Sequence, residues 1–227
     1  MINFYEFVYG IDYIFNKSNI DTEPHISADT KHLAVQILID SDDRIDCLNK
    51  VSLDVACCTK CRLSMGRTNI VFGEGSTNPR LMFIGEGPGY EEDRQGKPFV
   101  GRAGQLLTKM IQAMGLVRES VYIANIVKCR PPDNRAPFKD EAETCKPYLI
   151  RQIDCLKPSI IVCLGSIATN YLLDLNISIT KVRGNFFDYK GIKVLPTYHP
   201  AYLLRNPNKK GEAWQDLQIV MGELLKK

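Results

Sequence analysis

The sequence predicts an α/β fold, a three-layer sandwich with a central four-stranded parallel sheet flanked by helices. Two observations lead to this fold class. Four short apolar runs follow one another between residues 81 and 198, each with the length of a buried strand. Segments with the apolar spacing of helices lie between them. Strands that alternate with helices are typical of a parallel sheet covered on both faces.

The apolar runs that we expect to be strands cover residues 81–85, 121–127, 160–165 and 193–198, and the helical patterns cover residues 103–114, 139–155 and 166–173. Pro196 lies in the last run and favours a strand end or an edge of the sheet there. Ligands of parallel sheets bind beyond the carboxyl ends of the strands. The polar residues expected at that edge are Glu86, Asn125 and His199.

The charge distribution divides the chain into an acidic extension, residues 1–45, and a basic domain, residues 46–227. The extension carries eight acidic and three basic residues, whereas the domain carries 18 acidic and 26 basic residues. A basic body suits a polyanionic partner such as DNA. The helical spacing of Leu33, Ile37 and Leu38 predicts an extension that is partly helical or flexible. It leaves room for a repair or replication partner to bind.

The hydropathy pattern argues against export and against a membrane span. No apolar run approaches the roughly 18 residues that a transmembrane helix needs. The apolar start of the chain contains Glu6 and Asp12 and lacks the basic residues that open a secretory signal. We therefore expect a cytoplasmic protein with no membrane partner.

Cysteine usage points to metal or cluster ligation. A chain with eight cysteines and no export signal is expected to ligate a metal rather than to form disulfides. Cys58 and Cys61 form a C-x-x-C pair, and Cys129 and Cys145 follow at a distance. Two close and two distant thiolates are what a four-ligand site needs. The residue types alone leave zinc and iron–sulfur both open.

The remaining cysteines receive weaker assignments. Cys57 adjoins the C-x-x-C pair and is a rival ligand, although the spacing favours Cys58. Cys155 and Cys163 lie in apolar patterns and are expected to be inert core residues. The pattern assigns no role to Cys47.

Three motifs resemble those of the family 4 uracil-DNA glycosylases. The first covers residues 85–93 and 96–104, with the sequences GEGPGYEED and GKPFVGRAG. The second, NIVKCRPP, covers residues 125–132, and the third, HPAYLLR, covers residues 199–205. The resemblance extends from about residue 56 to residue 217, with the motifs in the family's order and at its spacing. Together the motifs are highly specific.

The resemblance implies a fold, a cofactor and an activity. It implies a four-stranded parallel sheet between helices, and a [4Fe–4S] cluster on Cys58, Cys61, Cys129 and Cys145 with a structural role. The implied activity is that of a monofunctional glycosylase, which hydrolyses the N-glycosidic bond of uracil in DNA and leaves an abasic site for base excision repair. We expect the enzyme to act as a monomer on uracil-containing DNA.

Chemistry supports roles for three residues in the motifs. Phe99 suits stacking on a uracil that has been flipped out of the duplex, as the matching residue does in the family. The Asn125 amide can pair with both O4 and N3–H of uracil, and cytosine would mispair with it. His199 is the candidate donor to uracil O2, where negative charge develops as the bond breaks. Gly85 and Gly87 complete the predicted substrate-binding set.

The residue that activates water is the least defined part of the predicted site. Family 1 enzymes resemble this chain in the first motif but carry an Asp where Gly87 stands here. Glu86 is the nearest carboxylate and is predicted to position water. By family analogy, Glu92 crowds the uracil C5 position and excludes the methyl group of thymine. Asp93 is open to either role.

DNA contacts are predicted on both sides of these motifs. The segment formed by Leu203, Leu204 and Arg205 is expected to enter the duplex where the base has left, as apolar wedges do. Arg205 and Arg102 are expected to contact phosphate.

Overall fold

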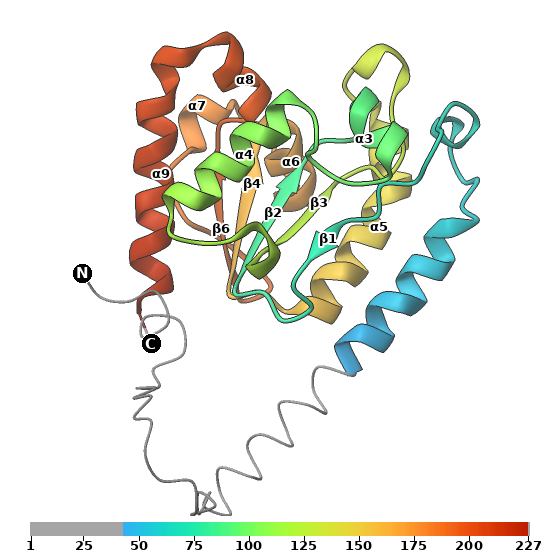
Figure 1. Ribbon diagram of the computed structural model, residues 1–227, viewed down its shortest axis with the longest axis horizontal. Coiled ribbons are helices and arrows are strands. Elements are labelled where there is room, and N and C mark those ends of the chain that lie inside the picture. Colours follow the sequence, from blue (N-terminus) through green and yellow to red (C-terminus); the bar gives the residue numbers. More distant parts are fainter. Residues whose placement is uncertain (1–42, 227) are drawn as a thin grey trace, which may run out of the picture. The chain divides into compact units, whose positions relative to one another are not determined.

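Four parallel strands form the centre of the sheet in the computed structural model, which describes residues 43–226 (Figure 1). They lie in the order β3-β2-β4-β6 and pair in parallel throughout. Each coincides with a predicted apolar run, so the parallel core is confirmed. Their bounds are Leu81–Gly85 for β2, Tyr122–Asn125 for β3, Ile160–Leu164 for β4 and Ile192–Thr197 for β6.

The sheet nevertheless has six strands rather than the predicted four. β1 (Glu74–Gly75) pairs antiparallel with β3, and β5 (Phe187–Tyr189) pairs antiparallel with β6. Both edge strands are short and partly exposed, so neither produces an apolar run in the sequence. The hairpin between β5 and β6 turns at Lys190 and Gly191, which have φ values of 52° and 83°. Two positive φ values in succession suit a two-residue hairpin turn.

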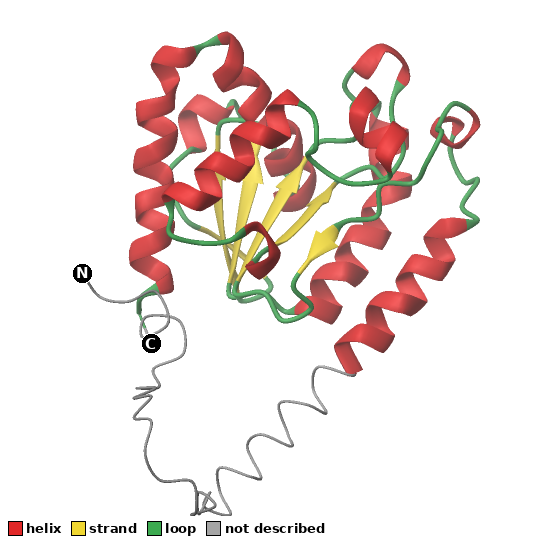
Figure 2. Cartoon of the chain, viewed as in Figure 1, coloured by secondary structure: helices red, strands yellow, loops and turns green. Residues whose placement is uncertain are grey.

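Helices cover both faces of the sheet, as predicted (Figure 2). On one face α4 (Arg102–Ala113) and α9 (Lys210–Leu224) pack against Leu81 and Phe83 of β2. On the other face Met82 and Ile84 pack against a helix over residues 43–56, α5 (Lys139–Leu156) and α6 (Gly165–Leu173). Alternate side chains of one strand thus serve the two cores, which is why β2 is apolar without interruption.

The chain order places a crevice at the carboxyl end of β2. From β2 the chain passes to β3 on one side and then to β4 on the other, so the strand order reverses there. Short helices bring side chains to this edge: α3 (Tyr90–Gln95) follows β2, and α8 (Pro200–Arg205) follows β6. The other short elements are α7 (Ile179–Val182), η1 (Arg62–Met65), η2 (Arg118–Ser120), η3 (Pro132–Asn134) and η4 (Pro207–Lys209).

Most of the predicted extension lies outside the described residues, including the helical pattern at Leu33, Ile37 and Leu38. The division of the chain at residue 45 therefore stays a prediction. The helix over residues 43–56 contributes Leu48, Val51 and Val55 to the core. None of the helices in the described part of the chain is long and apolar enough to cross a membrane.

Candidate active site

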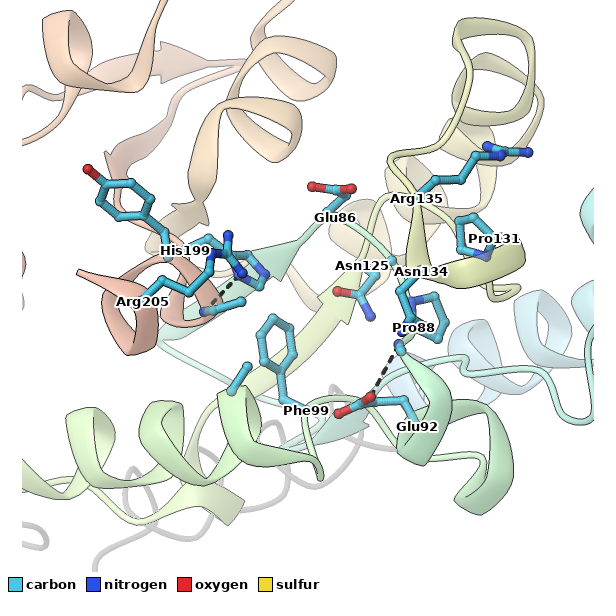
Figure 3. Close-up of a pocket in the computed structure, with 15 residues that line it drawn as sticks. Glu86, Pro88, Glu92, Phe99, Asn125, Pro131, Asn134, Arg135, His199 and Arg205 are labelled. Carbon is cyan, nitrogen blue, oxygen red and sulfur yellow. Dashed lines mark hydrogen bonds between the residues drawn. The ribbon is translucent and has the colours of Figure 1, made fainter. Parts of the chain in front are cut away.

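One pocket of about 470 Å³ lies beyond the carboxyl ends of β2, β3 and β6, and we call it the active-site pocket (Figure 3). It brings together residues that are up to 119 positions apart in the chain. Its walls combine apolar and polar side chains, as small-molecule sites do. Among the residues that line it are Glu86, Gly87, Glu92, Phe99, Asn125, His199 and Arg205, all of them predicted from the sequence.

Asn125 supplies an unpaired acceptor to this pocket. It is the last residue of β3, and its side chain is only 1% exposed. Its Oδ1 has no hydrogen-bond partner, which makes it the one buried side-chain polar atom in that state among the described residues. A buried unpaired acceptor costs roughly 1–3 kcal/mol. The group is therefore expected to receive a hydrogen bond from a ligand.

Gly85 explains how Asn125 and Phe99 approach each other. Gly85 lies opposite Asn125 in the pairing of β2 with β3. A Cβ atom at this position would stand 2.4 Å from Asn125 Oδ1 and 2.5 Å from Phe99 Cζ. Both distances are far below van der Waals contact. Only glycine leaves room for the amide and the ring at the floor of the pocket.

Phe99 forms the aromatic wall of the pocket in an unusual backbone conformation. Its φ is 52°, in the left-handed region that bulky residues rarely adopt. Its ring is 6% exposed, and the ring centroid lies 5.6 Å from that of His199. In Figure 3 the ring stands between Asn125 and His199. Strain of this kind persists where the surroundings fix the backbone.

Two charged side chains fix the loop that carries Phe99. Glu92 Oε1 accepts the backbone N–H groups of Val100 at 2.9 Å and Gly101 at 2.8 Å. Arg118 donates to the carbonyl oxygen of Pro98 at 2.6 Å. The other oxygen of Glu92 accepts the N–H that precedes helix α3. Glu92 therefore lines the pocket, but its carboxylate is engaged in holding the backbone on both sides of it.

His199 presents a neutral imidazole to the pocket. It is the N-cap of α8, where Nδ1 accepts the backbone N–H of Ala201 at 3.1 Å. Burial, together with the positive charge of Arg205, lowers the pKa of His199 to about 4. In the neutral ring Nδ1 is an acceptor, so the proton lies on Nε2. The ring can then donate from Nε2 at neutral pH.

The carboxylates near the pocket differ in their surroundings. Glu86 directly follows β2 and lines the pocket, and burial raises its pKa. Asp93, which the sequence left open as an alternative, accepts the backbone N–H groups of Thr68 and Asn69 instead. It does not line the pocket. Glu86 is therefore the carboxylate available to a ligand or a water molecule there.

The residues predicted to contact DNA are not all on the surface. Arg102 is exposed at the first position of α4, and Arg205 is exposed at the last position of α8. Leu204 is half-buried. Leu203, however, is 2% exposed and packs with Tyr198. It lies on the face of α8 that is turned towards the protein interior. The expectation that Leu203 enters DNA is corrected: in this arrangement only Leu204 and Arg205 are available.

The structure adds residues that the sequence did not single out. Asn134 and Arg135 line the pocket from the loop that follows the second motif. Arg135 is held by Glu141, with N–O distances of 2.7 and 2.8 Å. No pattern in the sequence indicated that this loop contributes to the active-site pocket.

The four predicted cysteines, Cys58, Cys61, Cys129 and Cys145, line a second pocket, which we call the cysteine pocket. Cys57, the rival ligand, is exposed and outside it. Within the described residues, no group of three or more His, Cys, Asp or Glu side chains is positioned to hold a metal ion.

The surroundings of the cysteine pocket supply hydrogen bonds to sulfur. The backbone N–H of Lys128 donates to Cys145 Sγ at 3.3 Å, and Arg67 donates to Cys129 Sγ at 3.3 Å. Burial raises the pKa of Cys145 to about 11 and also raises that of Cys129. Four thiols around one pocket, with N–H donors aimed at sulfur, fit a thiolate-bound metal centre, whose positive charge would hold the thiols ionised.

Two cysteines correct the expectation that the chain avoids disulfides. Cys47, which had no assigned role, is disulfide-bonded to Cys155, with a Cα–Cα distance of 5.7 Å. Cys155 was expected to be an inert core residue. The sequence could not indicate the pair, because 108 residues separate the two cysteines and only the packing of the helix over 43–56 on α5 brings them together. Cys163 is a free, fully buried thiol in β4, as predicted.

Comparison with protein families identifies the class to which this fold and pocket belong. Residues 72–218 match the family model of the uracil DNA glycosylase superfamily. The match begins just before β1 and includes every residue of the active-site pocket.

Individual relatives narrow the assignment. The chain is similar to the type-4 uracil-DNA glycosylase of Thermotoga maritima, with 52% identity over 72% of this chain and 86% of the relative. It is 51% identical to that of Sulfurisphaera tokodaii, over 78% of this chain and 84% of the relative. It is 47% identical to the type-4 uracil-DNA glycosylase of Saccharolobus solfataricus, over 81% of this chain and 89% of the relative. The chain belongs to the type-4 uracil-DNA glycosylase family, which confirms the resemblance of its motifs.

Proposed function

We propose that this protein is a monofunctional uracil-DNA glycosylase. It hydrolyses the N-glycosidic bond of a uracil flipped out of DNA and leaves an abasic site without cutting the strand, the first step of base excision repair. The observation that carries the proposal is the unpaired Asn125 Oδ1 in the active-site pocket, beside the ring of Phe99. The type-4 relatives support the same substrate.

The pocket can select uracil through the Asn125 amide. Oδ1 accepts the N3–H of uracil, and Nδ2 donates to uracil O4. Cytosine lacks a proton on N3 and carries an amino group in place of O4, so both contacts would fail. Buried groups left unpaired in this way cost roughly 1–3 kcal/mol each. Phe99 stacks on the extruded base and holds it against the amide.

His199 stabilises the leaving group. As the glycosidic bond breaks, negative charge develops on uracil O2, and the neutral His199 ring donates to it from Nε2. A positioned donor of this kind contributes roughly 3–4 kcal/mol. Ionised Glu86 orients the attacking water on the sugar side. Because Gly87 stands where family 1 enzymes carry an Asp, the chain relies more on leaving-group stabilisation than on a strong general base.

DNA is held at the rim of the active-site pocket. Arg205 lines the pocket, and Arg102 directly precedes Ala103, which lines it too. Both arginines are exposed and contact phosphates, which supply most of the salt-dependent affinity. Leu204 enters the space that the flipped base leaves in the duplex.

Cys58, Cys61, Cys129 and Cys145 of the cysteine pocket would hold a [4Fe–4S] cluster. Bound there, it would tie distant parts of the chain together, and a hydrolysis would need no electron from it. The four thiols and their N–H donors support this assignment. The purified protein should be brown, with broad visible absorbance and matched iron and sulfide contents. A colourless, zinc-containing and fully active protein would overturn it.

The function is tested with duplex oligonucleotides that carry one uracil, cytosine or thymine at the same position. Strand cleavage after alkali, on the uracil substrate only, is the expected result. The absence of any alkali-dependent product would overturn the proposed activity. Cleavage before alkali would show a lyase activity and would contradict the monofunctional assignment.

A further inference from the structure

A buried lysine that lines the cysteine pocket is also bonded to Asn125 of the active-site pocket. Lys128 is three residues after Asn125 and directly precedes Cys129. Its side chain is 1% exposed and is among the largest that the described residues bury completely. Lysine is almost never buried in this way unless it is paired. The partners of its ammonium group therefore indicate its purpose.

The Lys128 ammonium donates two hydrogen bonds to uncharged oxygen atoms. One joins Nζ to the backbone carbonyl oxygen of Asn125 at 2.9 Å, and the other joins Nζ to Gln152 Oε1 at 2.6 Å. Gln152 is fully buried, and its amide nitrogen donates to Phe72 O at 3.0 Å and to Tyr122 Oη at 3.2 Å. These bonds fix the direction of Oε1. Lys128 is thus tied to a side chain that is itself held in place.

Helix α5 contacts this segment a second time. The backbone N–H of Lys128 donates to Cys145 Sγ at 3.3 Å. Cys145 and Gln152 are seven residues apart on α5, two helical turns, and therefore lie on the same face. One face of α5 accordingly supplies a cysteine to the cysteine pocket and an anchor for the end of strand β3.

The carbonyl that Lys128 holds belongs to the residue whose side chain selects the base. The N–H of the same peptide, from Ile126, donates to Gly85 O at 3.0 Å. The hydrogen bond from Lys128 holds the carbonyl side of this peptide as well, so its orientation is fixed from two sides. The direction of the Asn125 amide depends on this backbone orientation. Loss of the hydrogen bond between Lys128 and the Asn125 carbonyl would leave the fold in place. The side-chain amide of Asn125 would then be less firmly oriented towards the pocket.

We propose that Lys128 is a positioning residue, which holds the Asn125 backbone on helix α5 so that the helix providing Cys145 also sets the orientation of the base-selecting amide. The proposal rests on the proposed function, since it assigns the recognition of uracil to Asn125. It also gives a cluster without a redox role a mechanical purpose: the bonds at Cys145 and Cys129 immobilise the segment on which Asn125 depends.

The experiment compares Lys128→Met with Lys146→Met in the cluster-containing protein. Lys146 is the residue after Cys145, and its ammonium pairs with Asp174 at 2.6 Å, away from the active-site pocket. For Lys128→Met we expect kcat/KM on a uracil-containing duplex to fall about 10–100-fold, by analogy with the loss of the outer partners that orient metal ligands. Visible absorbance per chain should stay that of the wild type. Lys146→Met should match the wild type in both.

A double-mutant cycle separates positioning from a general structural effect. In an Asn125→Ala background there is no amide to aim, so adding Lys128→Met should lower kcat/KM by less than about threefold. A loss in that background as large as in the wild type would overturn the proposal, as would full activity of Lys128→Met. So would a parallel loss of visible absorbance and activity, which would make Lys128 a support of the cluster alone.

A second variant keeps the test decisive if Lys128→Met does not fold. Gln152→Leu leaves the lysine in place and removes its anchor, so it should lower kcat/KM in the same direction but by less. Unchanged activity of Gln152→Leu would then overturn the proposal. Wild-type activity is measured first on the same duplex: an inactive wild type overturns the proposed function, whereas an active wild type with an unaffected variant overturns only the role of Lys128.

Discussion

The active-site pocket and the cysteine pocket lie at the two ends of one short segment, residues 125–129, yet they are built in opposite ways. The active-site pocket leaves Asn125 Oδ1 unpaired and holds Phe99 in a left-handed conformation. In the cysteine pocket, sulfur atoms already accept hydrogen bonds from Lys128 and Arg67. The active-site pocket leaves a hydrogen-bond acceptor free for a ligand. In the cysteine pocket the sulfur acceptors are already bonded to the protein and hold the chain in place.

This contrast predicts which measurement each region controls. Substitutions in the cysteine pocket should appear first in stability, because they release segments that are far apart in the chain. Substitutions in the active-site pocket should appear in turnover and should leave stability nearly unchanged. Four experiments, from the largest expected free-energy effect to the smallest, test the separation.

Cys145→Ser should cause the largest change, a loss of stability towards unfolding. Loss of a ligand from a structural metal centre belongs to the class of changes that cost more than about 4 kcal/mol. For a domain of this size that corresponds to a fall in Tm of roughly 8–16 °C. Thermal unfolding and visible absorbance should both report it. Cys57→Ser is the matched control, since Cys57 is exposed and outside the cysteine pocket. Equal Tm values for the two variants would contradict the structural role.

Asn125→Asp and His199→Ala should come next. Each should reduce kcat on uracil-containing DNA by roughly 10²–10³-fold, about 3–4 kcal/mol, because each removes a donor aimed at the base or its developing anion. Tm should change little. Single-turnover release of uracil measures the effect, and Asn185→Asp, at an exposed position, controls for the added charge. Wild-type kinetics in either site variant would remove the assignment of the active site.

Gly85→Ala should have an intermediate effect. The new methyl group would overlap the Asn125 amide and the Phe99 ring. Overpacking of this kind costs roughly 1–3 kcal/mol. If the Asn125 amide and the Phe99 ring are the groups that move, this cost corresponds to a fall of about 5–150-fold in kcat/KM. Gly222→Ala in α9 is the control, because nothing lies within 4 Å of its added Cβ. A Gly85→Ala enzyme with normal kcat/KM and reduced stability would show that the strain is relieved elsewhere.

The pH dependence of activity should show the smallest effect. Burial raises the pKa of Glu86. The role proposed for this carboxylate, to position water, requires its ionised form. Activity should therefore fall as the pH drops through the raised pKa of Glu86, by up to about tenfold per pH unit. The Glu86→Gln variant should be slower and should lack this acid limb until His199 is protonated near its pKa of about 4. An acid limb that is identical in Glu86→Gln would assign it to another group.

Much of the fold was predictable because its signals are local. The strands β2, β3, β4 and β6 are continuous apolar runs, since both faces of the sheet are buried, and α4, α5 and α6 carry helical spacing. The edge strands β1 and β5 were missed because they leave no local signal in the sequence. They are two and three residues long and only partly buried, so their pairing with a neighbouring strand, and not their composition, defines them.

The site was predictable where a residue's chemistry follows directly from its place after a strand. Glu86, Asn125 and His199 each stand at or just beyond the carboxyl end of a parallel strand, and topology alone brings such residues to one edge. Leu203 was misplaced because its exposure depends on how one turn of α8 rotates against Tyr198. The disulfide between Cys47 and Cys155 was missed because a contact across 108 residues leaves no local trace.

The sequence by itself thus determined the parallel sheet, the set of four cysteines and the residue types that line the active-site pocket, because periodicity, spacing and motif are properties of neighbouring residues. Only the tertiary structure decided that Asn125 Oδ1 is unpaired, that the proton of neutral His199 lies on Nε2, and that Lys128 joins the two pockets. These facts depend on burial and on hydrogen bonds between distant segments, and both exist only once the chain has closed around them.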